Sequence, residues 1–195
     1  MRKKLKTGLI LFLLTLSGCG LFDLRDAESP VESRSNFIPP TSPDIVISNL
    51  VSAISERNIT NYLQCFVDSN FSEKRFSYVA DANSASQYPI LRFWTLTNER
   101  YYFTNVISST PNSGTSALFL SDMVINNTSD TAIVDSDYLL RFDHTKQNVS
   151  KTLKGQFRLI MAADSRNLWS IYKWIDFRKT PTDTTWSTLK ANFSN

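Results

Sequence analysis

Few side chains in this 195-residue sequence have the type and the surroundings for chemistry. The only histidine, His144, follows Asp143 at the end of a predicted strand and leads into the polar pair Thr145-Lys146. An imidazole could act as a general acid or base near neutral pH. A residue that enters a polar turn is more often exposed, so we expect His144 to lie on the surface.

The sequence lacks the common motifs for phosphate binding, for a nucleophilic serine and for calcium binding. After Gly20 the sequence contains only Gly114 and Gly155, so there is no glycine-rich phosphate loop. It has no Gly-x-Ser-x-Gly elbow for a nucleophilic serine. Asp135-Ser136-Asp137 lacks the spacing of a helix-loop-helix calcium loop and is typical of a solvent-facing strand. We therefore predict neither a metal nor a cofactor.

The first 18 residues have the order of an export signal. Basic side chains in residues 2–6 precede an almost unbroken apolar run over residues 9–16, and the small residues Ser17 and Gly18 follow. The apolar run is less than half of the roughly 20 residues that a membrane-spanning helix needs. We therefore expect residues 1–18 to be removed.

The segment Leu16-Ser17-Gly18-Cys19 resembles the box that ends a bacterial lipoprotein signal. The resemblance implies cleavage before Cys19, a diacylglycerol on its sulfur and acylation of its new amine. Several acyl chains, at about 0.8 kcal/mol per buried CH₂, would form a lasting anchor. The residue after Cys19 is Gly20 and not aspartate. In the enterobacterial pattern, this implies that the lipoprotein is sorted to the outer membrane. With Cys19 lipidated, Cys65 has no disulfide partner, and we expect it to be a small buried side chain on a helix rather than a reactive thiol.

Removing the leader changes the charge of the chain. The full sequence has 21 basic and 18 acidic residues, and the leader holds four of the basic residues and no acidic one. The remaining 177 residues therefore carry a net charge of −1, which leaves no basic excess for nucleic acid. Their number suits one domain. We expect a lipidated, flexible tether over residues 19–41, which are rich in charges, serine and proline, and a single domain over residues 42–195.

The domain begins with helical patterns and continues with strand patterns. Ser42 and Pro43 suit a helix start. Apolar residues recur at helical spacing over residues 47–54, 59–66 and 102–107, and again in the tail at 186–193. Residues 71–79 alternate as a short strand, residues 80–89 are predicted to be a loop, and longer alternating strands are predicted at 117–126, 133–144, 151–163 and 168–178.

This order predicts an α+β fold, with N-terminal helices packed on a curved antiparallel sheet. A lipocalin-like all-β barrel is the alternative, and the helical patterns count against it. The Ser42-Pro43 start, the break Glu56-Arg57-Asn58 and the last strand, Trp169 to Asp176, resemble the nuclear-transport-factor-2-like, or cystatin-like, superfamily. The resemblance covers residues 42–178. It implies a cone-shaped domain with a pocket at its wide end.

Asp176 is the catalytic candidate that this resemblance offers, because ketosteroid isomerases and scytalone dehydratase on such cones use pocket carboxylates. A bulge at Tyr172-Lys173 would turn Trp174 and Asp176 to the face of Trp169 and Ile171. The alternative is a solvated residue at a strand end. We found no second carboxylate to pair with Asp176.

The aromatic residues are the candidates for binding. Trp94, Tyr101, Trp169 and Trp174 could line an apolar pocket for a lipid-like or aromatic ligand. The alternative is that they fill the core.

We expect a cell-envelope protein attached to membrane lipid through Cys19, at the periplasmic side or surface of the outer membrane. Its domain would bind a small apolar ligand or an envelope protein without catalysis. The alternatives are an isomerase or dehydratase acting through Asp176, and a structural subunit of an envelope complex.

Overall fold

The computed structural model describes residues 36–194. The export signal, Cys19 and most of the predicted tether lie outside this part of the chain. Residues 36–41 lie against the domain, because the side-chain amide of Asn49 bonds both the N–H and the carbonyl of Ile38, at 3.0 and 2.7 Å. The N–H of Trp169 also donates to the Pro40 carbonyl at 2.7 Å. In the described range, no helix combines the length and the apolar character needed to cross a membrane.

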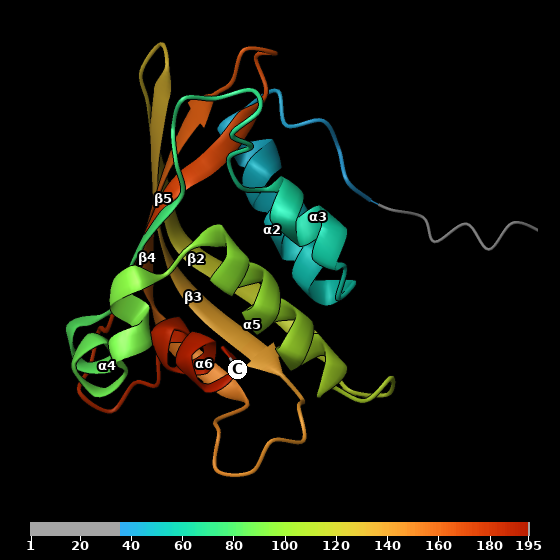
Figure 1. Ribbon diagram of the computed structural model, residues 1–195, viewed down its shortest axis with the longest axis vertical. Helices are drawn as coiled ribbons and strands as arrows, with labels where there is room; N and C mark the ends of the chain where they lie inside the picture. The colour runs from blue at the N-terminus through green and yellow to red at the C-terminus, as the bar shows by residue number, and fades with distance from the viewer. Residues whose placement is uncertain (1–35, 195) are drawn as a thin grey trace, which may run out of the picture. The chain divides into compact units, whose positions relative to one another are not determined.

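Five strands form one open, mixed sheet in the order β1-β5-β4-β3-β2 (Figure 1). The four long strands are antiparallel neighbours, and the short β1 runs parallel to β5. This confirms the predicted α+β class. The lipocalin-like barrel is wrong, because β1 and β2 are the two edges of the sheet and do not meet. The strands are β1 (Ser77–Val79), β2 (Ser116–Asn127), β3 (Thr131–Phe142), β4 (Thr152–Ala163) and β5 (Trp169–Phe177).

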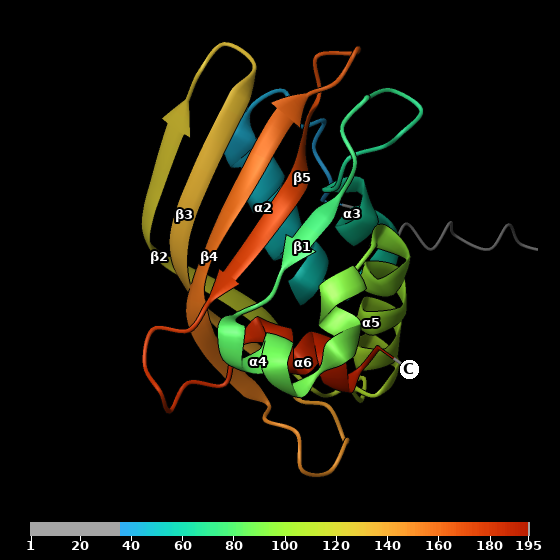
Figure 2. The same cartoon turned by 60° about the vertical axis from the view of Figure 1, so that its left-hand side comes forward.

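Helices lie on one face of this sheet. The helices α2 (Pro43–Ser55), α3 (Ile59–Gln64) and α5 (Leu96–Ser108) run across it in Figure 1. The helix α6 (Trp186–Asn192) lies beside α5 at one end of the same face, next to α4 (Ala82–Gln87), as Figure 2 shows. A 3-10 helix, η1 (Pro89–Phe93), joins α4 to α5.

The prediction of a loop over residues 80–89 is wrong, because this segment contains α4 and the start of η1. Asp81 caps α4: its carboxylate accepts the N–H groups of Asn83 and Ser84, both at 3.2 Å. Such a cap satisfies N–H groups that have no partner within the helix. The helix therefore depends on a cap and on tertiary contacts rather than on an apolar stripe.

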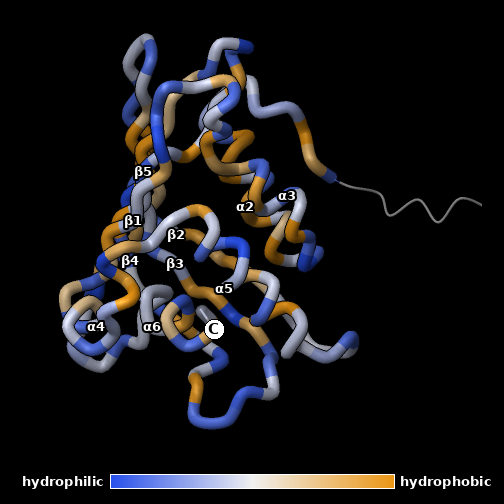
Figure 3. The backbone as a smooth tube through the Cα atoms, viewed as in Figure 1, coloured by the Kyte–Doolittle hydropathy of each residue, from blue (hydrophilic) through white to orange (hydrophobic). Residues whose placement is uncertain are grey.

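The core lies between the helices and the sheet. Figure 3 shows apolar positions interspersed with polar ones along α2, α5 and the strands. This alternation buries one side of each element and leaves the other polar. Fully buried members of the core include Leu50 and Ile54 of α2, Phe103 of α5, Phe142 of β3 and Leu159 of β4.

The predicted bulge in the last strand is confirmed. Ile160 of β4 pairs with Lys173 and the next residue, Met161, pairs with Ile171, so Tyr172 is the extra residue in β5. A bulge shifts the alternation of side chains by one position. As a result Ile171, Trp174 and Asp176 all lie buried on the helix-covered face.

Candidate functional site

Asp176 lies inside the protein, with 1% of its surface exposed. The alternative of a solvated strand-end residue is therefore wrong, because the bulge turns the side chain inward and α6 covers it. Its Oδ1 accepts the Tyr138 hydroxyl at 2.8 Å, and its Oδ2 accepts the N–H of Ser187 at 2.8 Å and the Ser187 hydroxyl. Burial raises the pKa of Asp176 to about 6, against the opposing effect of the hydrogen bonds from Ser187 and Tyr138.

A second buried carboxylate, which the sequence did not single out, is Glu99 of α5. It forms an ion pair with the ammonium group of Lys190 of α6, and both side chains are fully buried. Its Oε2 accepts the Tyr62 hydroxyl and its Oε1 accepts the Trp94 indole N–H, both at 2.8 Å. Burial lowers the pKa of Lys190, and the neighbouring Glu99 opposes this shift.

Aromatic rings surround the Lys190 ammonium group. It lies 4.1 Å from the centroid of the Trp174 ring and 4.2 Å from that of Tyr78. A cation over a ring face is attracted by the π electrons, and the attraction grows when water is excluded. Trp94 and Trp174, two of the predicted ligand-binding residues, thus meet around a side chain of the protein itself.

The helix α6 packs against the interior groups around Asp176 and Glu99. Trp186 packs edge-on against Trp174, with ring centroids 4.6 Å apart. Its backbone N–H donates to the Tyr138 hydroxyl at 2.7 Å, and its indole N–H donates to the Tyr102 hydroxyl at 2.8 Å. Asp176 and Glu99 therefore face the polar and aromatic groups of α6 rather than solvent.

The remaining sequence candidates lie apart from this interior. Tyr101 is 55% exposed on α5, and Trp169 is half-buried at the start of β5. His144 is fully buried, so its predicted exposure is wrong: the chain after α6 brings Phe193 edge-on against its ring, with centroids 5.0 Å apart. Burial lowers the pKa of His144. Cys65 is buried, as predicted, but it caps the end of α3 rather than lying within a helix.

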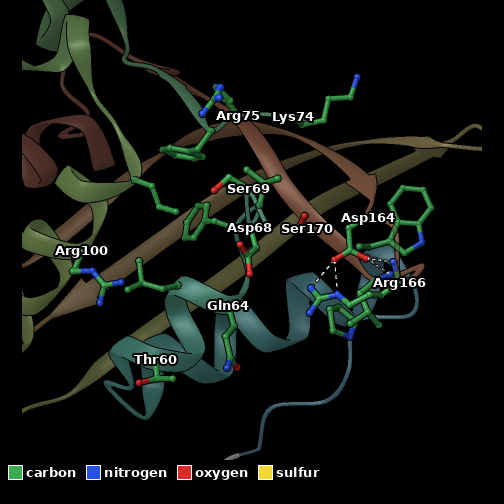
Figure 4. A pocket seen from close by; sticks show the side chains of 18 of the residues that line it. Thr60, Gln64, Asp68, Ser69, Lys74, Arg75, Arg100, Asp164, Arg166 and Ser170 are labelled. Carbon is green, nitrogen blue, oxygen red and sulfur yellow. Dashed lines mark hydrogen bonds and ion pairs between the residues drawn. The ribbon is translucent and has the colours of Figure 1, made fainter. Parts of the chain in front are cut away.

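A groove of about 920 Å³ lies beside α3, and we call it the lateral groove. Its walls come from α3, the segment 67–76, the start of α5 and the turn between β4 and β5 (Figure 4). Apolar side chains form much of its surface. They include Leu63, Phe66, Phe76, Leu96 and Trp169.

Four cationic and two anionic side chains also line the lateral groove, which gives the lining a net charge of +2. Arg166 is paired with Asp164, with Nη2 and Oδ2 2.6 Å apart, and its guanidinium lies over the Phe71 ring. Within residues 36–194, the other three cations make no ion pair. They are Lys74, Arg75 and Arg100, and the remaining anion is Asp68.

The described residues contain no group of three or more histidine, cysteine or acidic side chains arranged to hold a metal ion. The lateral groove thus offers apolar surface and positive charge. It was not predicted, because its residues are far apart in the sequence and follow no motif. Only Trp169, at its edge, was among the candidates.

No protein-family model and no curated protein matches this sequence. Similar solved structures include a proposed scytalone dehydratase from Novosphingobium aromaticivorans, with 13% identity and a TM-score of 0.52 over 73% of this chain and 84% of that one. A nuclear transport factor 2 (NTF2-like) superfamily protein from Salmonella enterica has 12% identity and a TM-score of 0.51 over 70% and 88% of the two chains. The fold is NTF2-like.

A proposed dehydratase of the NTF2-like family from Streptomyces avermitilis has 10% identity and a TM-score of 0.51, over 70% of this chain and 93% of that one. At such identities the likeness concerns the backbone arrangement alone. Of the residues predicted to line a pocket, Trp94 and Trp174 surround Lys190 of α6, whereas Trp169 lines the lateral groove.

Proposed function

We propose that this chain is a lipid-anchored cell-envelope protein whose NTF2-like domain binds a ligand in the lateral groove without catalysing a reaction. The observation that carries the proposal is the contrast between two places in the domain. The interior carboxylates Asp176 and Glu99 are bonded to α6, whereas the lateral groove is open and has the volume of an organic-ligand site.

The anchor is supported by the segment Leu16-Ser17-Gly18-Cys19 at the end of a short export signal. We expect Cys19→Ser to move the protein from the membrane fraction to the soluble fraction. Cys65→Ala is the matched control and should stay with the membranes. A mature chain that retains residues 1–18 and carries no acyl mass would refute the anchor.

Ligand binding is tested on the native protein extracted in mild detergent. Denaturing the purified protein should release a small molecule that mass spectrometry detects. Ser69→Trp places an indole in the lateral groove and should abolish the release, whereas Ser113→Trp, on an exposed turn outside the groove, should not. Equal release from both variants would place the ligand elsewhere.

The raised pKa of Asp176 favours an enzyme of the isomerase or dehydratase type as the second candidate. Two of the similar structures are proposed dehydratases. Such an enzyme requires α6 to leave Asp176 accessible. If the ligand binds in the lateral groove without reaction, the denatured Asp176→Asn variant should release the same small molecule as the wild type, in the same amount. If Asp176→Asn instead accumulates an unreacted form of it, the enzyme is favoured.

A further inference from the structure

We propose that the lateral groove takes an amphiphile with one carboxylate, whose apolar part packs against Phe66, Phe76 and Trp169 and whose head group meets Arg75 and Arg100. This inference rests on the proposed function, since it assumes that the lateral groove is the binding site. It adds the chemical class of the ligand.

The shape and the apolar wall of the lateral groove favour a small organic molecule. A volume of about 920 Å³ lies near the upper end of the range for pockets that bind such ligands. Phe66 and Phe76 meet edge-on in the wall, with ring centroids 5.0 Å apart, and the half-buried Trp169 also lines the groove. Burying an apolar chain against these rings is favourable in proportion to the area removed from water.

The charges of the lateral groove select the head group. Arg75 and Arg100 make no ion pair within residues 36–194, and a guanidinium matches the two oxygens of a carboxylate. The two guanidinium groups would repel a cationic head group, and a neutral head group would leave them without an ion-pair partner. These two arginines therefore favour an anion.

Asp68 limits how much negative charge the ligand can carry. Figure 4 shows Asp68 and Ser69 in the middle of the lateral groove, with Arg100 and Arg166 on opposite sides of the view. Asp164 already neutralises Arg166. The Lys74 ammonium group lies over the Tyr172 ring, 5.5 Å from its centroid, and Tyr172 is not part of the groove lining. Arg75, Arg100 and Asp68 then leave a local charge of +1, which a monoanion such as a carboxylate balances.

The tryptophans provide a built-in reporter for a test. Trp94, Trp174 and Trp186 are at most 4% exposed and Trp169 lines the lateral groove, so a ligand there should change mainly the emission of Trp169. The probes are dodecanoate, dodecanol, dodecyltrimethylammonium and dodecyl phosphate, below their micellar concentrations. They are added to the full chain carrying Cys19→Ser, with binding measured in parallel by calorimetry.

We expect dodecanoate to bind at least tenfold more tightly than the other three probes, and Trp169→Phe to remove the fluorescence change. Arg75→Gln with Arg100→Gln should weaken dodecanoate at least tenfold and leave dodecanol unchanged. Arg92→Gln, an exposed arginine of η1 outside the lateral groove, is the matched control.

Three results would overturn the inference. Tighter binding of dodecyl phosphate or of the cationic probe would show that the head group is wrong. Absence of binding by all four probes, while native extracts still yield a small molecule that Ser69→Trp loses, would refute the ligand class but keep the proposed function. Absence of both probe binding and released ligand would refute the two proposals together.

Discussion

Lys190 and Glu99 form an ion pair in which neither side chain has any exposed surface. Removing one partner of such a pair leaves an uncompensated buried charge, which typically costs about 3–5 kcal/mol. We therefore expect Lys190→Met to lower the free energy of unfolding by this amount in urea titrations. The double variant Glu99→Gln with Lys190→Met should regain part of the loss. A single variant as stable as the wild type would show that Glu99 finds another partner.

Asp176 should make stability depend on pH between about 4 and 6. Its pKa is about 6 in the folded protein, against about 3.9 in an unfolded chain. The folded state therefore binds more protons in this window, and the contribution of Asp176 to stability is lost as pH rises through it. The loss amounts to about 3 kcal/mol, at about 1.4 kcal/mol per pH unit.

The measurement compares the free energy of unfolding of the wild type and Asp176→Asn from pH 4 to pH 7. Taking the difference removes the contributions of carboxyl groups that both proteins share. The wild type should lose stability relative to the variant as pH rises. A constant difference between the two curves would contradict the raised pKa.

Gly155 of β4 allows Tyr138 to approach the strand closely. A Cβ at Gly155 would lie 2.6 Å from the Tyr138 hydroxyl and 2.6 Å from the Phe177 carbonyl oxygen. Gly155→Ala should therefore displace the hydroxyl that bonds Asp176, and destabilise the fold by about 1–3 kcal/mol through overpacking. Gly114→Ala is the comparison, because a Cβ there would lie 3.1 Å from its nearest atoms and would require a smaller shift. Thermal unfolding that changes equally in both variants would argue against this role.

The Cys65 thiol should be unreactive in the folded protein. Burial raises its pKa, and the thiolate is the reactive form. Iodoacetamide should add to Cys65 only in denaturant, as measured by intact mass. A cysteine introduced at the exposed Ser113 should react without denaturant, and equal rates at the two sites would contradict the burial of Cys65.

The strands and the long helices could be predicted because their patterns are local. Burial alternates along β3 and recurs with helical spacing along α2, and both patterns are written directly in the residue types. The bulge at Tyr172 could also be predicted, since it alone places Trp174 and Asp176 on the buried side. The short α4 was missed because its signal is a cap at Asp81 rather than an apolar stripe.

The interior contacts could not be predicted, because they join residues that are distant in the sequence. Lys190 lies in a segment with a recognisable apolar stripe, but nothing in that segment indicates that its charge meets Glu99 on α5. His144 was assigned to the surface for the same reason: the ring that covers it, Phe193, comes from the end of the chain. A buried charge without a partner is costly. A single sequence does not show which distant residue is that partner, so the burial of such a charge could not be predicted.

The pairing of β1 with β5 has a consequence for the order of folding. Ser77 pairs with Lys173, and Phe66, just after α3, bridges to Ile171. The early segments thus find their hydrogen-bond partners only after nearly the whole chain has been synthesised, and contacts of such long sequence separation form slowly. A polypeptide that is synthesised amino end first therefore cannot complete this sheet until its last strand has been released.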